Sequence, residues 1–248
     1  MNFIDVHSHV LPGMDDGSPD VETSLAMLRK WRDQGVEKII ATPHFDFRDI
    51  SVDSFIAKRR RSFEKLSLAM RESGEKFCEI ELGAEVMYSS NIFGFIDLSA
   101  LSIGETPFVL LEFATELTSE KVSTMLSSHS MSDMSVILAH TERYKCFGFM
   151  HRLRKLRNAD IRFQVNFSSF LPDSPFRRTA DAMMKNDMVD LFATDAHSIK
   201  TRPPEFADIL CEIRREYGKR NVDRILERSV RYFGKKRLVM LIKNKIKP

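Results

Sequence analysis

The sequence has few of the residues and patterns that several protein classes require. It contains three cysteines at scattered positions in 248 residues, an odd number that suits a reducing compartment better than a disulfide framework. No apolar stretch reaches the roughly 20 residues of a membrane-spanning helix. The N-terminal stretch lacks the basic segment and apolar core of a signal peptide. We therefore expect a cytoplasmic protein without a transmembrane segment.

Loops that bind nucleotide phosphates are missing as well, because neither a Walker-type Gly-Lys-Ser/Thr loop nor a glycine-rich dinucleotide fingerprint occurs. The segment Cys146–Arg152 has the Cys-five-Arg spacing of cysteine-dependent phosphatases. That chemistry needs a tight loop of free backbone N–H groups around the phosphate and a thiolate of low pKa. Phe147 and Phe149 are bulky for such a loop, so we disfavour a cysteine nucleophile. A cysteine enzyme would lose activity on Cys146→Ser and would be indifferent to a chelator.

The net charge of +3 is small but unevenly distributed. Tyr217–Pro248 holds 11 Lys/Arg and 2 Asp/Glu, which leaves a net charge of −6 for residues 1–216. Bound divalent cations would offset part of that negative charge, and an acidic body without a basic track argues against nucleic acid as a partner. We expect the basic end to be a solvated helix, with peripheral contact to an anionic membrane or an acidic partner as the alternative.

The chain does have a regular alternation of short apolar runs and amphipathic stretches. Most of the apolar runs do not alternate with polar residues, as expected for parallel strands covered on both faces. The expected strands cover residues 3–6, 38–42, 79–85, 108–113, 135–140, 162–167 and 191–195. The expected helices cover residues 18–35, 52–73, 119–131, 146–158, 175–187 and 204–217, and the first of them should be capped by Ser18 before Pro19. Strand–helix repetition of this kind predicts a parallel sheet.

Ligand-type residues follow nearly every expected strand, and this distribution decides between two parallel architectures. An open, doubly wound sheet would concentrate them at one switch point, whereas a barrel carries its site around the carboxyl-terminal rim. We therefore predict an α/β protein with a single-domain, irregular (β/α)7 TIM-like barrel over residues 1–216. Residues 217–248 are expected to form a basic helical extension that packs on the same domain or trails from it.

Two pairs of ligand-type residues stand out at strand ends. His7 and His9 are two residues apart, as are Asp195 and His197, so both members of each pair can point into one mouth. A single histidine is more often a core or surface residue, but two such pairs favour a metal site. Asp16 precedes Gly17, so a turn role is its plain alternative.

Two carboxylates, Glu85 and Glu112, end strands that otherwise look buried, and an unpaired buried carboxylate is costly. A cation or a basic partner such as Arg143 must therefore be near. Arg143 and Arg202 would project from rim loops, where a fork of donors suits a phosphate dianion. Ordinary surface arginines are the alternative.

At these residues the chain resembles the polymerase and histidinol phosphatase (PHP) superfamily, and more narrowly the bacterial metal-dependent protein tyrosine phosphatases of capsule and exopolysaccharide loci. The resemblance runs from about Met1 to Pro204. The motifs that carry it are Asp5-Val6-His7-Ser8-His9, Asp15-Asp16-Gly17, Ala41-Thr42-Pro43-His44, Gly83-Ala84-Glu85, His140…Glu142-Arg143-Tyr144 and Asp195-Ala196-His197…Arg202-Pro203-Pro204. One departure is Thr141, where the family usually has proline.

The resemblance implies a PHP fold with three divalent metal ions, usually Mn, although the ligand types also allow Fe or Zn. It implies one ion on His7, His9, Glu85 and Asp195. A second would lie on Glu85, Glu112 and His140, and a third on Asp16, His44 and His197. Arg143 and Arg202 would bind the substrate phosphate. The partner would be the phosphotyrosine tail of a membrane-associated bacterial tyrosine kinase that governs polysaccharide synthesis, and an oligomer is possible.

The function expected from these observations is phosphomonoester hydrolysis, in which a metal-bound hydroxide attacks a phosphate held by the two arginines. A tyrosinate leaving group, with a pKa near 10, needs little help from a general acid. The alternatives are a small-molecule phosphatase of the same superfamily that acts on histidinol phosphate or a nucleotide, a phosphodiesterase or exonuclease, and a metal-stabilised binding protein without catalysis.

Overall fold

The computed structural model of the protein describes residues 3–89, 92–95, 97–114, 118–129, 133–144 and 150–234. The strands in these ranges are β1 (Ile4–Ser8), β2 (Lys38–Ala41), β3 (His44–Phe45), β4 (Glu79–Leu82), β5 (Glu85–Met87), β6 (Phe108–Glu112), β7 (Ser135–Leu138), β8 (Arg162–Asn166) and β9 (Leu191–Ala193). The helices are α1 (Val21–Asp33), α2 (Val52–Glu72), α3 (Ile92–Phe95), α4 (Ser119–His129), α5 (Met150–Asn158), α6 (Arg177–Lys185), α7 (Ala207–Tyr217) and α8 (Lys219–Phe233). Short 3₁₀ turns follow several strands, among them Thr141–Arg143 and Phe167–Phe170.

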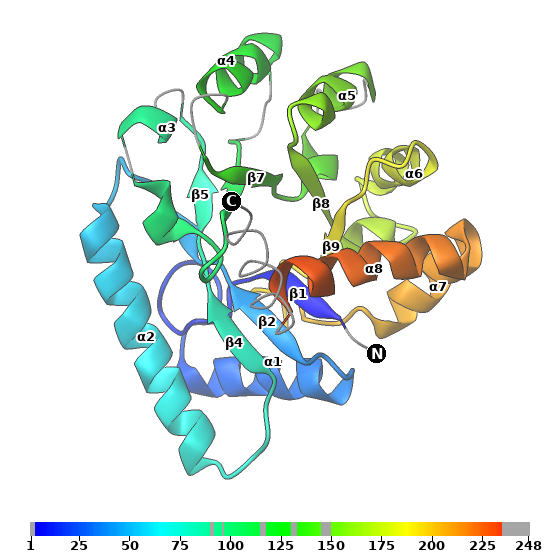
Figure 1. Ribbon diagram of the computed structural model, residues 1–248. Helices are drawn as coiled ribbons and strands as arrows, with labels where there is room; N and C mark the ends of the chain where they lie inside the picture. Colours follow the sequence, from blue (N-terminus) through cyan, green and yellow to red (C-terminus); the bar gives the residue numbers. More distant parts are fainter. Residues whose placement is uncertain are drawn as a thin grey trace, which may run out of the picture.

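All the strand pairs in these ranges are parallel, and the helices lie around the outside of the strands (Figure 1). Hydrogen bonding groups the strands into two sheets, ordered β1-β2-β4 and β3-β5-β6-β7-β8-β9. The predicted parallel α/β architecture is therefore confirmed, but the structure shows two sheets rather than one closed barrel.

The run 38–42 forms one strand, β2, as expected, and the short strand β3 follows it after a break. The run 79–85 was also expected to form one strand, and this expectation is wrong, because a similar break divides it between β4 and β5. The interruption falls at Pro43, which has no N–H to donate, and at Gly83. Backbone pairing nevertheless continues across it, because Gly83 N donates to Ala41 O (2.8 Å) and Glu85 N to Pro43 O (3.1 Å). The second strands carry His44 and Glu85 further along the same direction.

The beginning of α1 also differs from the prediction. Asp20, not Ser18, caps the helix, and its carboxylate accepts the backbone N–H of Thr23 (2.8 Å). Ser18 is buried and its hydroxyl lies 2.8 Å from that of Ser24. The chain therefore enters the helix one residue after the proline, and Ser18 ties the preceding loop to the first turn of α1.

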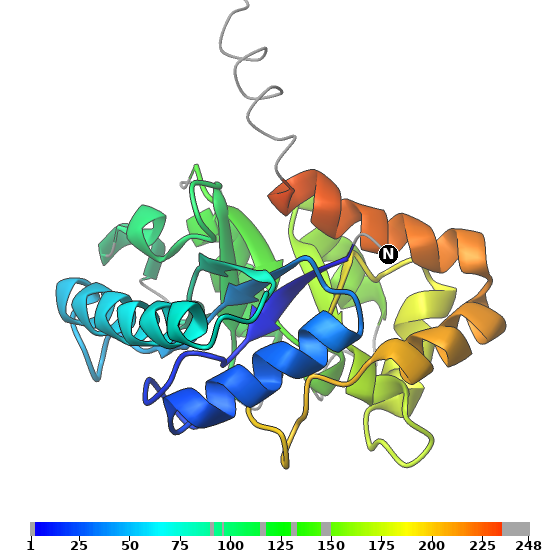
Figure 2. The ribbon, with the colours of Figure 1, turned by 90° about the horizontal axis from the view of Figure 1, so that it is seen from below.

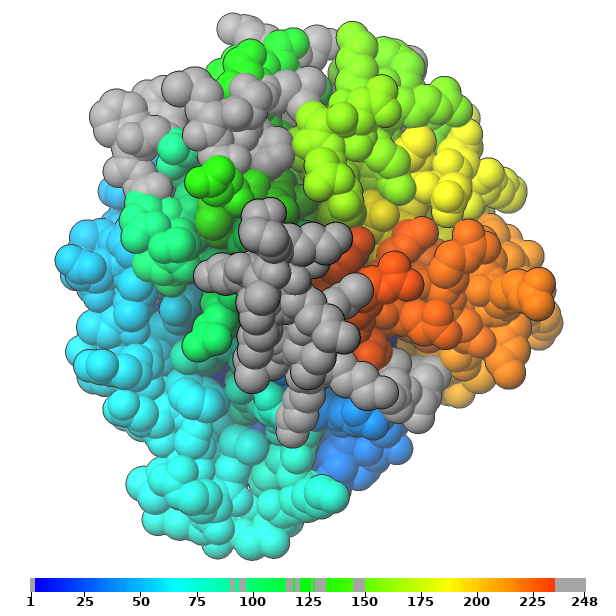
Figure 3. All heavy atoms as spheres, viewed as in Figure 1, coloured from blue at the N-terminus to red at the C-terminus, as the bar shows by residue number. Residues whose placement is uncertain are grey.

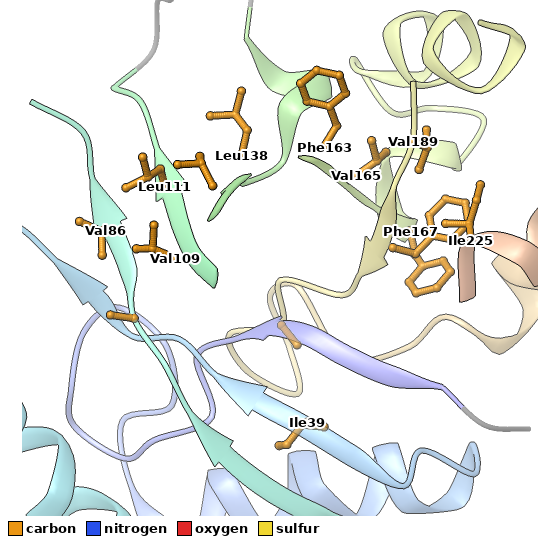
Figure 4. Packing of buried hydrophobic residues seen from close by; sticks show 14 of the residues in the cluster. Ile39, Val86, Val109, Leu111, Leu138, Phe163, Val165, Phe167, Val189 and Ile225 are labelled. Carbon is orange, nitrogen blue, oxygen red and sulfur yellow. The ribbon is translucent and has the colours of Figure 1, made fainter. Parts of the chain in front are cut away.

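Alternation along the strands separates the apolar side chains into two clusters. Outward-facing residues such as Val109, Leu138 and Val165 belong to the larger cluster beneath the helices (Figure 4). The smaller cluster takes inward-facing residues from both sheets: Ile4, Val6, Ile40, Leu110, Ile137, Ala139, Leu191 and Ala193, with Ile103 and Phe233. The two sheets therefore share one interior. Full burial of each of the larger side chains, those of valine, leucine, isoleucine and phenylalanine, contributes roughly 1.5–3 kcal/mol.

The helix α8 is part of this body. Its buried residues include Val222, Ile225 and Leu226, which pack in the outer cluster, and Phe233, which enters the inner one. In Figure 2 α8 lies along one side of the strands, next to α7. A view of the molecular surface shows α2 on one flank and α7 with α8 on the other (Figure 3). The basic residues after Gly234 lie outside the described residues, and where the chain divides into domains stays a prediction.

Asp5 connects three of these elements. Its buried carboxylate accepts hydrogen bonds from the indole of Trp31 in α1 (2.8 Å) and from the backbone N–H of Thr194 after β9 (3.0 Å). Burial raises the pKa of Asp5, although the bonds from Thr194 and Trp31 oppose the rise. Asp5 thereby holds β1, β9 and α1 together just below the strand ends. Within the described part of the chain, no helix has the length and apolar character needed to cross a membrane.

Candidate metal centre

The nine predicted metal-ligand residues lie together, at or beyond the carboxyl ends of β1, β2, β4, β6, β7 and β9. They come from β1 and the loop after it, from β3, β5 and β6, and from the loops that follow β7 and β9: His7, His9, Asp16, His44, Glu85, Glu112, His140, Asp195 and His197. The predicted convergence of these side chains is therefore present in the structure. Three groups among them place one potential ligand atom from each residue within 4.8 Å of the others.

Strand alternation alone would not bring all nine side chains inward. Ile4 and Val6 already face the inner cluster, so a regular strand would turn His7 toward the helices. The β1–β2 register is irregular between Asp5 and Ser8, and His7 joins the site. An irregular register of this kind re-aims a side chain.

The side chain of His140 is also turned into the site, in this case by the conformation of its own backbone. Ala139 faces the inner cluster, and the next residue, His140, reaches the site with a φ of 28°. Asp195 and Arg202 also have positive φ, 52° each. Such backbone is unfavourable for residues other than glycine and persists where the surroundings hold it. Three of the proposed functional residues therefore occupy strained positions.

Glu85 is the centre of the buried part of the site. Its carboxylate is fully buried and lies between four imidazoles, with His140 Nε2 at 2.9 Å, His7 Nε2 at 3.0 Å, His44 Nδ1 at 3.2 Å and His9 Nε2 at 3.3 Å. Asp195 Oδ1 lies 3.4 Å from both His7 Nε2 and His9 Nε2. Burial opposes ionisation of Glu85, but the neighbouring imidazoles outweigh it and hold its pKa well below the usual value.

A second part of the site is more open to solvent. Asp16 is 62% exposed, and its Oδ1 lies 3.4 Å from His44 Nε2 and 3.4 Å from His197 Nε2. His44 also reaches Glu112, with Nδ1 at 2.9 Å from Oε1. Burial lowers the pKa of His197 to about 4, and the nearby charge of His9 adds to the effect. His197 is therefore neutral at pH 7 with a lone pair available.

Both predicted arginines border this cluster. Arg143 Nη1 lies 2.9 Å from Asp195 Oδ2, and Arg202 Nη1 lies 3.5 Å from the same oxygen. Arg202 also pairs with Asp16, with Nη2 at 3.2 Å from Oδ2. The two guanidinium groups thus lie against one buried carboxylate from two different loops, and each leaves further N–H donors for an anion.

The donor set fits divalent cations. Both oxygens of Glu85 and Nε2 of His197 are buried without a hydrogen-bond partner among the described residues, although unsatisfied buried polar atoms are expensive. Imidazole nitrogens and carboxylate oxygens are ligands for Mn, Fe and Zn. Bound cations would satisfy these atoms.

Sequence reasoning missed the residues that support the proposed ligands. Asp15 Oδ2 accepts from His9 Nδ1 (2.7 Å) and from the backbone N–H of His44 (2.9 Å). Burial opposes ionisation of Asp15, but its contact with His9 dominates and lowers its pKa strongly. Gln164 and Asn166 lie below His7, His140 and Asp195. Their signal in the sequence is a pair of amides that alternate with the apolar residues Phe163 and Val165 along a strand.

A cleft of about 520 Å³ adjoins Arg202. Apolar residues form much of its wall, and they include Phe167, Leu171, Phe206 and Ile209. Leu171 is one of few large apolar side chains that are exposed among the described residues, at 39%. The cleft offers room for an extended ligand beside the arginine.

The fold and these residues define a parallel α/β protein with a candidate metal centre on one side of its strands. The chain belongs to the capsular polysaccharide synthesis family CpsB/CapC, whose model matches residues 3–232. The family predicted from the sequence is thereby confirmed.

The relatives of the chain have consistent names. The tyrosine-protein phosphatase CpsB of Streptococcus agalactiae is 26% identical over 234 residues, which cover 90% of this chain and 94% of the relative. The tyrosine-protein phosphatase YwqE of Bacillus subtilis is 24% identical and covers 87% of this chain and 85% of the relative.

Solved structures agree on the fold. A chain from the crystal structures of Bacillus subtilis YwqE and Streptococcus pneumoniae CpsB, described as unique metal-dependent tyrosine phosphatases, matches with a TM-score of 0.81 at 22% identity. The match covers 92% of this chain and 93% of that chain. The lactonase Lmo2620 from Listeria monocytogenes matches with a TM-score of 0.52 at 11% identity, over 94% of each chain.

Proposed function

We propose that the protein is a metal-dependent phosphatase that hydrolyses phosphotyrosine in a protein substrate. The observation that carries the proposal is Glu85, a fully buried carboxylate that lies within 3.3 Å of four imidazoles and has no hydrogen-bond partner among the described residues. Membership of the CpsB/CapC family and relatives named tyrosine-protein phosphatases support it.

The proposal includes three divalent cations, with Mn²⁺ as the first choice. His7, His9, Glu85 and Asp195 would hold one ion; Glu85, Glu112 and His140 a second; Asp16, His44 and His197 a third. The geometry adds one feature to this allocation. His44 lies next to Glu85 and Glu112 as well as Asp16, so it borders two of the proposed positions.

When bound, such cations lower the pKa of water and neutralise phosphoryl oxygens. The chain itself supplies the remaining functions. Arg143 and Arg202 would hold the phosphate and stabilise the charge that develops on its oxygens. Asp195 orients both guanidinium groups through Oδ2. The tyrosinate leaving group has a pKa near 10, so its departure needs little protonation.

The cleft beside Arg202 supports a peptide substrate over a small phosphate ester. Its apolar wall would contact residues that flank the phosphotyrosine, for which histidinol phosphate has no equivalent. The proposed partner is the phosphorylated tail of a membrane-associated tyrosine kinase that acts in capsule or exopolysaccharide synthesis, and the proposed location is the cytoplasm. We also propose peripheral contact of the basic segment 217–248 with an anionic membrane; its residues 235–248 lie outside those described.

The proposal also takes the strands to close into a barrel between β1 and β9. Support comes from two backbone hydrogen bonds, from His9 N to Ala196 O (2.9 Å) and from Asp195 N to His7 O (3.0 Å), and from a parallel bridge between Ser8 and Ala196. These contacts lie at the level of the proposed ligands.

Hydrolysis of three substrates by metal-loaded enzyme tests the function. We expect rapid release of phosphate from a phosphotyrosine peptide, slower release from histidinol phosphate, no cleavage of an oligonucleotide, and loss of activity after treatment with a chelator. The variant Cys146→Ser should retain full activity. Rapid turnover of histidinol phosphate with none of the peptide would replace the proposed substrate class, and cation binding without cleavage of any ester would leave a metal-stabilised binding protein.

A further inference from the structure

Strand β8 differs from the other strands of its sheet, each of which carries a proposed ligand or is closely followed by one. Its sequence, Arg-Phe-Gln-Val-Asn, contains no histidine or carboxylate, and the turn after it, Phe167–Phe170, contains none either. Its inward-facing side chains are Gln164 and Asn166, and both are fully buried. Two buried amides impose a cost unless their polar atoms are paired, so their hydrogen bonds show what the strand contributes.

The two amides form a directed chain of hydrogen bonds. The backbone N–H of His140 donates to Gln164 Oε1 (2.8 Å). Gln164 Nε2 donates to Asn166 Oδ1 (2.6 Å), and Asn166 Nδ2 donates to Asp195 Oδ2 (3.0 Å). A backbone N–H can only donate, so it sets the orientation of Gln164, and Gln164 in turn sets the orientation of Asn166. Neither amide can be flipped without placing a donor against a donor or an acceptor against the carboxylate.

This orientation determines which nitrogen of His7 carries the hydrogen. His7 Nδ1 lies 3.1 Å from Gln164 Oε1, which is an acceptor, so Nδ1 must be the donor. His7 Nε2 then presents its lone pair toward Glu85 Oε2 and Asp195 Oδ1, at 3.0 and 3.4 Å. Ligating histidines commonly donate their second ring N–H in this way, which fixes the tautomer and the ring orientation.

The same chain of hydrogen bonds holds the carboxylate of Asp195 in place. Asn166 Nδ2 and Arg143 Nη1 both reach Oδ2, at 3.0 and 2.9 Å. Oδ1 is the oxygen that faces His7 and His9. The carboxylate is thus divided between a supported oxygen and an oxygen directed into the proposed metal position. His140 and Asp195 lie at the two ends of this chain of hydrogen bonds, and both have positive φ. The amides therefore restrain backbone that would otherwise relax.

We propose that Gln164 and Asn166 are positioning residues for the metal centre, which set the tautomer of His7 and the orientation of His140 and Asp195. The inference rests on the proposed function, because it assigns a role relative to the proposed cations. Removal of support of this kind typically lowers metal affinity about 10- to 100-fold.

Calorimetric titration of metal-free protein with Mn²⁺ tests the proposal. We expect Gln164→Met, which removes both the acceptor and the donor at similar volume, to weaken Mn²⁺ binding about 10- to 100-fold. The variant Gln164→Glu keeps the acceptor for His7 and His140 and should recover part of that loss. Asn166→Leu should weaken binding too, because Asp195 Oδ2 loses a donor.

Val165→Ala is the matched control, since Val165 lies between the two amides, is fully buried and packs in the outer cluster. It should lower the melting temperature of the metal-free protein and leave Mn²⁺ affinity unchanged. A far-ultraviolet circular dichroism spectrum and a melting curve for each variant establish that it is folded. If Gln164→Met fails to fold, the comparison of Gln164→Glu and Asn166→Leu with Val165→Ala still distinguishes a positioning role from general destabilisation.

The possible outcomes separate the two proposals. Wild-type affinity in folded Gln164→Met and Asn166→Leu would overturn the positioning role and leave the metal centre intact. Equal loss of affinity in Val165→Ala would also overturn it, because general destabilisation would then explain the effect. Failure of the wild-type protein to bind Mn²⁺ would overturn the proposed function together with this inference.

Discussion

The two parts of the metal centre differ in how the protein holds them. In the inner part, His7, Glu85 and Asp195 are almost fully buried. His7 Nδ1 and Asp195 Oδ2 there contact further buried side chains. In the outer part, Asp16 is 62% exposed and His44 is 37% exposed. Buried, supported ligands are held in place before a cation arrives, whereas exposed ligands must be ordered by it. The inner part is therefore expected to bind cations tightly and the outer part to exchange more readily.

The strongest test of this comparison removes the charge of Glu85. We expect Glu85→Gln to lower kcat/KM by more than about 100-fold, beyond the range seen when only supporting residues are changed, because four imidazoles lose their shared carboxylate. The matched control is Glu81→Gln in β4, where Glu81 pairs with Lys38 at 3.1 Å, away from the cluster. Steady-state kinetics with a phosphotyrosine peptide measures both. Equal effects at the two positions would contradict a central role for Glu85.

The next test compares the two arginines. Arg143→Lys keeps the charge but loses the fork of donors, and we expect kcat/KM to fall about 100-fold. Arg202→Lys should have a smaller effect, since Arg202 is more exposed, at 38% against 23% for Arg143. The fall in kcat/KM of Arg202→Lys should appear mainly as a higher KM. The order of the two effects decides whether burial governs phosphate binding, and a larger loss at Arg202 would reverse the comparison.

Protons distinguish the two parts of the site as well. Burial opposes protonation of His140, but Glu112 and Glu85 outweigh it and raise its pKa to about 10, so the metal-free protein carries this proton at pH 7. A cation at His140 must displace it. A cation at His197, which is neutral because its pKa is lowered to about 4, displaces none. Affinity for the cation at His140 should therefore rise up to about tenfold per pH unit between pH 7 and 9.

Titration in buffers of different ionisation enthalpy counts these protons. Release of more protons on filling the inner part, where the pKa values of His9 and His140 are both raised, than on filling the outer part, where that of His44 is raised and that of His197 is lowered, is the expected result. The stability of the metal-free protein should change with pH in the opposite direction to the cation affinity. A histidine whose pKa is raised stabilises the folded state below its unfolded pKa, about 6.5, and that contribution is lost as the pH rises toward 10. Metal-free protein that becomes more stable over this range would contradict the assignment.

The smallest expected effect concerns the cleft beside Arg202. Leu171→Asp should raise KM for a phosphotyrosine peptide about three- to tenfold, as expected when a half-exposed apolar contact is lost, and leave hydrolysis of a small aryl phosphate unchanged. Leu68→Asp on α2, where the side chain is 48% exposed, is the control. If both variants behave like the wild-type protein, the cleft does not contribute to peptide binding.

Much of the site could be predicted because its residues have local signatures. His7 with His9 and Asp195 with His197 follow apolar runs, and parallel strands deliver such residues to one edge. The supporting residues have no comparable signature. Gln164 and Asn166 are neutral amides, and their role depends on a backbone N–H from the loop after β7, 24 residues away from Gln164 in the sequence. Asp15 could have been found, since it precedes Asp16, but nothing local separates the two carboxylates.

The sequence by itself determined the parallel α/β class, the family and the set of proposed ligands, because hydrophobic periodicity and the order of motifs are properties of neighbouring residues. The tertiary structure decided how these side chains meet. Only the irregular register of β1 turns His7 inward, and only the strained backbone at His140 and Asp195 lets them reach the cluster. Orientation at a strand end is set by pairing with other strands and by buried hydrogen bonds, which connect residues far apart in the chain.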